Sequence, residues 1–133
     1  MAGIYIHIPF CRKACNYCNF HFSTNHQLMD QMIEAMVHEI ALQKTYLSEP
    51  IETLYFGGGT PSLLNQAHLA MLMEAVKLHF NLMPNAEITL EANPDDIDTA
   101  HLKDWVRLGI NRLSIGIQSF RNEDLQWMGR AHN

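Results

Sequence analysis

The chain has 133 residues, enough for one domain of ordinary size. Hydrophobic residues make up 47% and charged residues 17%, a balance typical of a globular protein and not of a disordered one. The net charge of −5 and the lack of a Lys- or Arg-rich run argue against a nucleic-acid partner, and no apolar stretch approaches the roughly 20 residues that span a bilayer.

Strands and helices are predicted to alternate from the start of the chain. The first strand covers Gly3 to Ile8, where alternate isoleucines share one face, and Pro9 ends its pairing. A helix is expected from about 27 to 47, where a methionine-rich stripe with helical spacing is most simply core. The stripe consists of Met29, Met32, Ile33, Met36, Val37 and Ile40.

A second and a third strand are predicted to flank a second helix. The strands are expected at 51–56, between Pro50 and Gly57, and at 87–91. The helix is expected at 66–80, where apolar residues fall on one side. These residues are Leu69, Leu72, Met73, Val76 and Phe80.

A third helix and a fourth strand are predicted in the last part of the chain. Asp98 or Thr99 is a suitable helix cap, and Gly109 is a suitable end signal. We expect three of the helix's apolar side chains to point inward, namely those of Leu102, Trp105 and Val106. The fourth strand is expected at 111–117, and a short helix is expected at 122–128.

This order predicts an α/β fold with a parallel sheet and right-handed crossovers. A closed (β/α) barrel of eight strands takes about 250 residues, so four strands cannot close one. We therefore expect residues 1–133 to be the amino-terminal portion of a TIM-like barrel, a single incomplete domain whose last strand has an unpaired edge.

All three cysteines of the chain, Cys11, Cys15 and Cys18, lie directly after the first predicted strand. Thiolates select zinc, Cu(I) or iron–sulfur clusters, and a set of three leaves one position of a metal centre open. An odd number of clustered cysteines argues against a disulfide framework and for a reducing compartment. No basic leader precedes the first strand, so we expect a cytoplasmic protein.

A zinc site is the main alternative at this position. His21 follows Cys18 by three residues, so the three cysteines and His21 match a closed Cys₃His site in a small zinc-binding interaction module. Such a module would not explain the polar residues that follow the other strands. The histidines on predicted helices are expected to face solvent or to be partly buried; they are His38, His68, His79 and His101.

Unusual polar residues also follow the other strands. Residues 57–61 read Gly-Gly-Gly-Thr-Pro and lack the lysine of a P-loop, so we expect this run to hold an amino-acid or ribose group, or else to be a tight turn. Glu91 ends the third strand and Gln118 follows the fourth. Ligands of parallel sheets collect at the carboxyl ends of strands, so these elements are expected on one rim. Taken singly, Glu91 or Arg130 would be read as a solvated charge.

Together these motifs resemble the radical S-adenosylmethionine (SAM) superfamily. The Cys-x₃-Cys-x₂-Cys spacing carries the resemblance to the superfamily. Longer sequence motifs are similar to the oxygen-independent coproporphyrinogen III oxidase group, above all to its haem chaperones of the HemW type. These motifs are YIHIPFC at 5–11, FGGGTPS at 56–62, EANP at 91–94, SIGIQSF at 114–120, and Gly129-Arg130.

The resemblance implies a role for each matching residue. Cys11, Cys15 and Cys18 would hold a [4Fe–4S] cluster whose fourth iron binds SAM. Tyr17 would lie beside the adenine. Tyr5, the one candidate for a catalytic role, would lie near the sulfonium, although a half-buried strand tyrosine is an equal interpretation. The remaining SAM contacts would be Gly58, Gly59, Thr60, Glu91, Gln118 and Arg130.

The resemblance also implies the function of the complete protein. A reductant such as flavodoxin or ferredoxin would supply the electron that cleaves SAM, and haem would be bound and delivered to acceptor proteins. The alternative is oxidative decarboxylation of coproporphyrinogen III, whose enzymes carry a further cysteine where this chain has Phe20. Asn19 stands where the group usually has Asp, and the terminal His132-Asn133 is not taken for the group's haem-binding HNxxYW motif. We expect residues 1–133 to be inactive alone.

Overall fold

The computed structural model describes residues 2–9 and 26–115, and it confirms the alternation of strands and helices within them. The main elements are β1 (Ala2–Ile8), α2 (His26–Leu42), β2 (Ile51–Gly58), α3 (Gln66–His79), β3 (Leu82–Ala92), α4 (Thr99–Leu108) and β4 (Arg112–Ile115). Two short 3₁₀ helices, η1 (Pro61–Leu63) and η2 (Pro94–Asp96), follow β2 and β3. The short helix expected at 122–128 lies outside the described residues.

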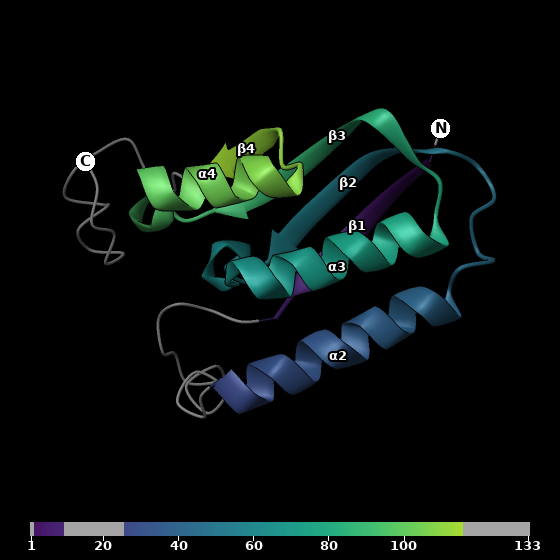
Figure 1. Cartoon of the computed structure of the whole chain (residues 1–133), viewed down its shortest axis with the longest axis horizontal. Helices are drawn as coiled ribbons and strands as arrows, with labels where there is room; N and C mark the ends of the chain where they lie inside the picture. The colour runs from purple at the N-terminus through teal and green to yellow at the C-terminus, as the bar shows by residue number, and fades with distance from the viewer. Residues whose placement is uncertain (1, 10–25, 116–133) are drawn as a thin grey trace.

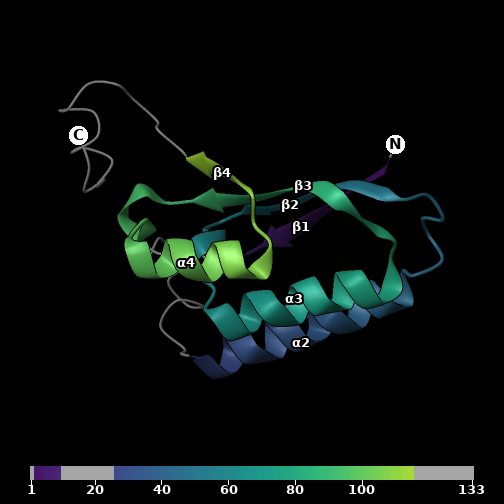
Figure 2. The same ribbon diagram turned by 45° about the horizontal axis from the view of Figure 1, so that its top comes forward.

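The described strands form one parallel sheet in the order β1-β2-β3-β4, which confirms the predicted α/β class. All three helices lie on one side of this sheet (Figure 2). Each helix begins at the carboxyl end of the strand before it (Figure 1). Within the described part of the chain, no helix covers the other face of the sheet. None of the described helices is long and apolar enough to cross a membrane.

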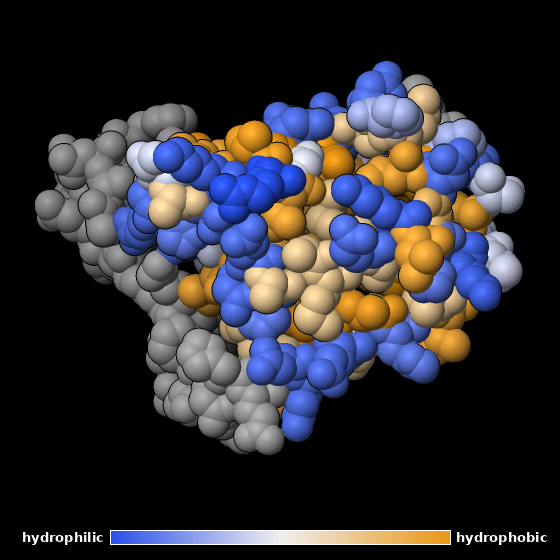
Figure 3. All heavy atoms as spheres, viewed as in Figure 1, coloured by the Kyte–Doolittle hydropathy of each residue, from blue (hydrophilic) through white to orange (hydrophobic). Residues whose placement is uncertain are grey.

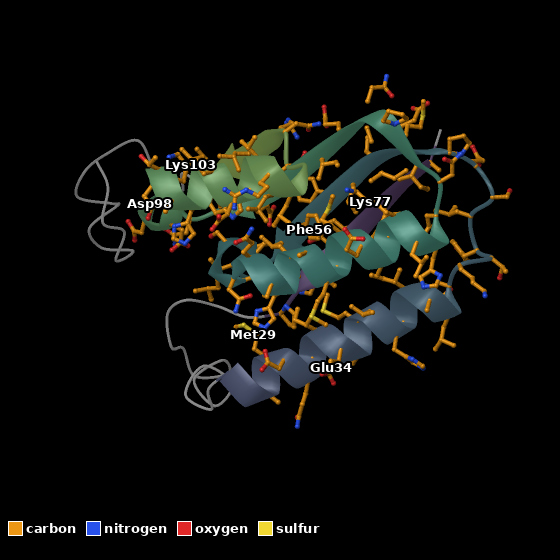
Figure 4. The ribbon with its side chains drawn as sticks, viewed as in Figure 1. Met29, Glu34, Phe56, Lys77, Asp98 and Lys103 are labelled. Atoms are coloured by element: carbon orange, nitrogen blue, oxygen red, sulfur yellow. The ribbon has the colours of Figure 1, made fainter. Side chains whose placement is uncertain are left out.

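The core lies between the sheet and the helices. Because side chains alternate along a strand, every second residue points to the helical side. Figure 4 shows Phe56, which is fully buried, in the layer between the sheet and α3. Burial of a side chain of this size contributes about 1.5–3 kcal/mol. The strand residues of this core include Ile6, Ile8, Leu54, Phe56, Ile88 and Leu90.

The methionine-rich stripe of α2 is core, as predicted. Ile33 is fully buried, and the stripe's methionines pack against the cluster around it, with Met29 between α2 and α3 (Figure 4). The helix ends at Leu42 and not near 47. The amide of Lys44 donates to the carbonyl of Ala41 at 3.3 Å, the spacing of a 3₁₀ turn. The apolar stripe ends with Ile40, so no core contact extends the helix further.

Strand β3 is longer than predicted, because it begins at Leu82 and not at 87. Pro84 and Asn85 read as turn residues in the sequence. In the structure the pairing of β2 with β3 changes register between Ile51 and Thr53, and the paired residue on β3 moves from Leu82 to Glu87. Proline has no amide hydrogen to donate to a neighbouring strand, so it is tolerated where the pairing is interrupted in this way.

The predicted ends of α4 are confirmed. The side chain of Asp98 caps the helix by accepting a hydrogen bond from the amide of His101 at 2.8 Å. Gly109 follows the helix with a φ of 104°, a left-handed conformation that favours glycine. These two signals are local, so they can be recognised in the sequence alone.

The predicted inward face of α4 is wrong for two of its three residues. Trp105 is buried, with 2% of its surface exposed, but Leu102 and Val106 are 38% and 70% exposed. Leu108 packs against the core beside Trp105, whereas the His101 ring contacts Trp105 and stays partly exposed. Hydrophobic side chains therefore interrupt the polar surface on the helical side of the molecule (Figure 3).

The rotation of α4 predicts unequal costs for neighbouring substitutions. We expect Trp105→Ala to lower the free energy of unfolding by about 3–5 kcal/mol, because it leaves a cavity under the sheet. The control, Val106→Ala, should change it by less than about 0.5 kcal/mol, because this side chain is in solvent. Urea unfolding followed by circular dichroism measures both. Equal losses would show that the helix is rotated as the sequence predicted.

Candidate functional site

The carboxyl ends of β1, β2 and β3 meet at one edge of the sheet. Ile8, at the end of β1, pairs with Gly58, at the end of β2. The amide of Gly59 donates to the carbonyl of Ile8 at 2.7 Å, so the glycine turn is bonded to β1. Glu91 stands near the end of the next strand. Strand β1 therefore ends beside this turn, and the segment that contains the three cysteines follows Pro9 in the sequence.

The glycine turn has no room for side chains. Gly58 has a φ of 110°, and a Cβ there would lie 2.7 Å from the carbonyl oxygen of Ile8. A Cβ on Gly57 would lie 2.7 Å from the Tyr5 hydroxyl and 2.8 Å from the Tyr55 ring. Backbone conformation and the contact with a backbone carbonyl therefore require glycine at Gly58, whereas a Cβ at Gly57 would have to displace the ring ends of the two tyrosines. The turn is tight, and it presents bare backbone at the rim.

Glu91 is not a freely solvated charge. Its side chain is half-buried, and each of its oxygens accepts a hydrogen bond. The amide of Gly58 donates to Oε1 at 3.0 Å, and the hydroxyl of Tyr55 donates to Oε2 at 2.7 Å. These two bonds hold the carboxylate against the glycine turn and fix the plane in which its remaining lone pairs lie.

Tyr55 is a site residue that the sequence interpretation missed. Its ring stacks on that of Tyr5, with centroids 5.6 Å apart and an interplanar angle of 17°. A hydrogen bond from Ser114 lowers the pKa of Tyr55, but the hydrogen bond to Glu91, burial and the charge of Glu91 together outweigh it, so the pKa lies above its usual value. Side chains alternate along β2, so Tyr55 lies on the same face as Gly57. This alternation is the sequence feature from which Tyr55 could have been predicted as a site residue.

A buried polar network behind the rim was also missed. The hydroxyl of Ser62 donates to Oδ2 of Asp96 at 2.7 Å and accepts from the amide of Asn93 at 3.1 Å. Both Ser62 and Asp96 are buried. The network joins η1, which follows the glycine turn, to η2, which follows β3. It therefore holds the two polar loops of the rim in place relative to each other.

Several predicted site residues lie outside the described residues. They are Cys11, Cys15, Tyr17, Cys18, His21, Gln118 and Arg130. Among the residues that the structure does describe, no group of three or more potential metal ligands is found. Thr60 precedes η1, and its carbonyl accepts from the amide of Leu63 at 3.0 Å. Among the predicted site residues that the structure describes, a hydrogen bond joins Gly58 to Glu91, Gly59 and Thr60 follow Gly58 in the chain, and Tyr5 lies further back along β1.

The histidines on the helices are not all at the surface. His38 is exposed, and His79 and His101 are partly buried, as expected. His68 is 4% exposed, which contradicts the prediction for it. Its Nε2 lies 2.6 Å from Oδ1 of Asp30, so it links α3 to α2. This contact satisfies one ring nitrogen, whereas Nδ1 is buried without a hydrogen-bond partner among the described residues.

The contact between Tyr55 and Glu91 predicts a measurable titration. Glu91→Gln should lower the pKa of Tyr55, because it removes a negative charge from beside the phenol. The raised pKa means that the bond stabilises the fold fully below about pH 10, and that this contribution is lost as the pH rises through the folded-state pKa. Nuclear magnetic resonance of ring-labelled tyrosine measures the titration, with Tyr55→Phe to assign the signal. An unchanged pKa in Glu91→Gln would contradict the contact.

Comparison with known proteins agrees with the motifs on this rim. A family profile described as the radical SAM superfamily matches residues 5–133. A zebrafish (Danio rerio) protein named radical S-adenosyl methionine domain-containing protein 1, mitochondrial, is 40% identical over 99% of this chain and 30% of its own length. A protein named heme chaperone HemW from Synechocystis is 41% identical over 96% of this chain and 32% of its own length. A protein of the same name from Escherichia coli K12 is 37% identical over 98% of this chain and 35% of its own length.

The fold is similar to that of two solved structures. Coproporphyrinogen III oxidase (HemN) from Escherichia coli, described as a radical SAM enzyme, superposes with a TM-score of 0.83 at 32% identity, over 99% of this chain and 31% of the enzyme. Archaeal Elp3 from Methanocaldococcus infernus, at 18% identity and a TM-score of 0.54, shows similarity of fold alone. The chain thus spans about a third of the length of the relatives that it matches.

Proposed function

The chain belongs to the radical SAM superfamily, and from this premise we propose that it is the amino-terminal part of a HemW-like haem chaperone that binds a [4Fe–4S] cluster and SAM. The observation that carries the proposal is the pairing of Ile8 with Gly58. The pairing sets the end of β1 beside the glycine turn, and the cysteine segment follows this strand in the sequence. A metal centre and a polar ligand site would then share one rim.

The three thiolates are the proposed cluster ligands. Cys11, Cys15 and Cys18 are soft donors, and their number leaves one iron of a [4Fe–4S] cluster without a protein ligand. When bound, the cluster supplies the electron that cleaves SAM. Flavodoxin or ferredoxin is the proposed class of reductant. The chain's own contribution is to hold the ligands and to orient SAM.

The described rim fits the polar groups of SAM. The amides of Gly58 and Gly59 are already bonded within the protein, so we propose that the turn would meet the ammonium group of SAM through backbone carbonyl oxygens. An ionised carboxylate has about four acceptor sites, and Glu91 uses two of them within the protein. Within the described part of the chain, two therefore remain, and we propose them for ribose hydroxyls or an ammonium group. Gly58, Gly59, Thr60 and Glu91 are therefore proposed as SAM contacts, with Tyr5 near the sulfonium.

Residues outside the described part keep the roles that the family motifs imply. We propose Tyr17 beside the adenine, and Gln118 and Arg130 as further SAM contacts. Arg130 would bind a carboxylate through its planar guanidinium. Residues 1–133 are proposed to be the amino-terminal portion of a larger radical SAM core, because the relatives named above are about three times as long.

Haem delivery is proposed from the names of the relatives, several of which are heme chaperones. Oxidative decarboxylation of coproporphyrinogen III is the second candidate, favoured by the similarity to HemN. Phe20, in place of a further cysteine, favours the chaperone. A full-length version assayed for protoporphyrinogen formation and for haem binding separates the two. The proposed compartment is a reducing one, and the zebrafish relative's name places that protein in mitochondria.

Reconstitution tests the cluster. We expect wild-type chain treated anaerobically with iron and sulfide to develop [4Fe–4S] absorbance and about four irons per chain. Cys15→Ala should lose most of this absorbance because it removes a ligand. His21→Ala is the matched control and should retain it. About one zinc per chain with no iron or sulfide, lost in His21→Ala, would instead support the zinc-binding module.

A further inference from the structure

One side chain on the open face of the sheet contacts two residues with proposed cofactor roles. The Tyr55 hydroxyl donates to Oε2 of Glu91 at 2.7 Å, and its ring stacks on Tyr5 at 5.6 Å. Both contacts depend on the absence of a side chain at Gly57, where a Cβ would lie within 2.8 Å of both tyrosines. No family motif described above assigns a role to Tyr55.

We infer that Tyr55 is a positioning residue, which holds the carboxylate of Glu91 and the ring of Tyr5 in the orientations in which they would meet SAM. This inference rests on the proposed function. A glutamate side chain has several rotamers, and the Gly58 amide alone constrains only one of its oxygens. The bond from Tyr55 constrains the second oxygen. The unused lone pairs of Glu91 are then presented in one direction, and no ordering cost is left to SAM binding.

The role inferred for Tyr55 is exerted through its hydrogen bond to Glu91 and its stacking on Tyr5. In the register of the sheet it pairs with Tyr5 and Thr89, one pleat further from the carboxyl edge than Gly57 and Glu91. Its hydroxyl is already engaged by Glu91. Its chemistry also matters, because phenylalanine would stack on Tyr5 equally well but would leave Oε2 of Glu91 without a donor. Hydrogen bonds to a charged acceptor are about twice as strong as neutral ones.

Affinity for SAM tests the inference. We use the full chain, anaerobically reconstituted, and measure SAM binding by isothermal titration calorimetry. Tyr55→Phe should weaken binding about fivefold to tenfold and leave the cluster absorbance unchanged. Tyr46→Phe is the matched control, because it removes the hydroxyl of an exposed tyrosine in the turn after α2, and it should bind SAM as wild type does.

A double-mutant cycle separates positioning from a general structural effect. If Tyr55 acts through Glu91, then Tyr55→Phe should cause no further loss of SAM affinity in a Glu91→Gln background. Losses that multiply would mean that the two residues act independently, and the positioning role would be overturned. Signals from the Tyr5 ring in the labelled protein should move in Tyr55→Leu, which removes the stacking, and move little in Tyr55→Phe.

The outcomes distinguish this inference from the proposed function. If wild type binds SAM and Tyr55→Phe binds it equally well, the positioning role is wrong and the proposed function stands. If wild type forms the cluster and binds no SAM, both fall together. If SAM affinity drops tenfold in Tyr55→Phe but not in Tyr46→Phe, and the cycle shows no further loss, both are supported.

Discussion

The register between β1 and β2 is the constraint on which the rest of the site depends. It pairs Tyr5 with Tyr55 and Ile8 with Gly58. A slip of one residue would turn every side chain of β1 to the opposite face of the sheet. The buried isoleucines would then face away from the helices, and the tyrosine stack would be lost. The same hydrophobic burial that stabilises the sheet therefore also places the functional groups at its edge.

The pairing of the strands also determines which groups contact the carboxylate of Glu91. A half-buried charge is costly unless hydrogen bonds compensate it. Here the two donors come from a backbone amide at the end of β2 and a phenol one pleat back on the same strand. Among the described residues, the compensation uses only part of the acceptor capacity of Glu91. Under the proposed function, the same carboxylate would contribute both to the stability of the fold and to ligand binding.

Much of the fold was predictable because its signals are local. The isoleucine alternation of β1, the Asp98 cap and the Gly109 end signal each depend on a few neighbouring residues, and the structure agrees with them. The inward face of α4 was not predictable, because Leu102, Trp105 and Val106 satisfy the same periodicity and only packing against the sheet decides between them. The contact of Tyr55 with Glu91 was missed because it joins residues 36 apart and depends on cross-strand register. The predicted roles of the cysteines came from the family motif, and they lie in a segment outside the described residues.

The face of the sheet that carries no described helix gives a further argument about the site. Barrel interiors that are packed solid are filled mainly by Val, Ile and Leu. This face instead carries polar and aromatic side chains, in register across the four strands. They are Tyr5, His7, Tyr55, Thr89, Glu91, Arg112 and Ser114. Arg112 lies 3.8 Å from Glu87 and 3.4 Å from the hydroxyl of Thr89, so this surface carries paired charges rather than a hydrophobic seam. If further strands continue the curve of this sheet, such a face suits a wet, ligand-filled cavity far better than a dry core. Under the proposed function, the polarity of the open face and the polar residues at the strand ends have one common explanation, which is a ligand that would enter from the carboxyl rim.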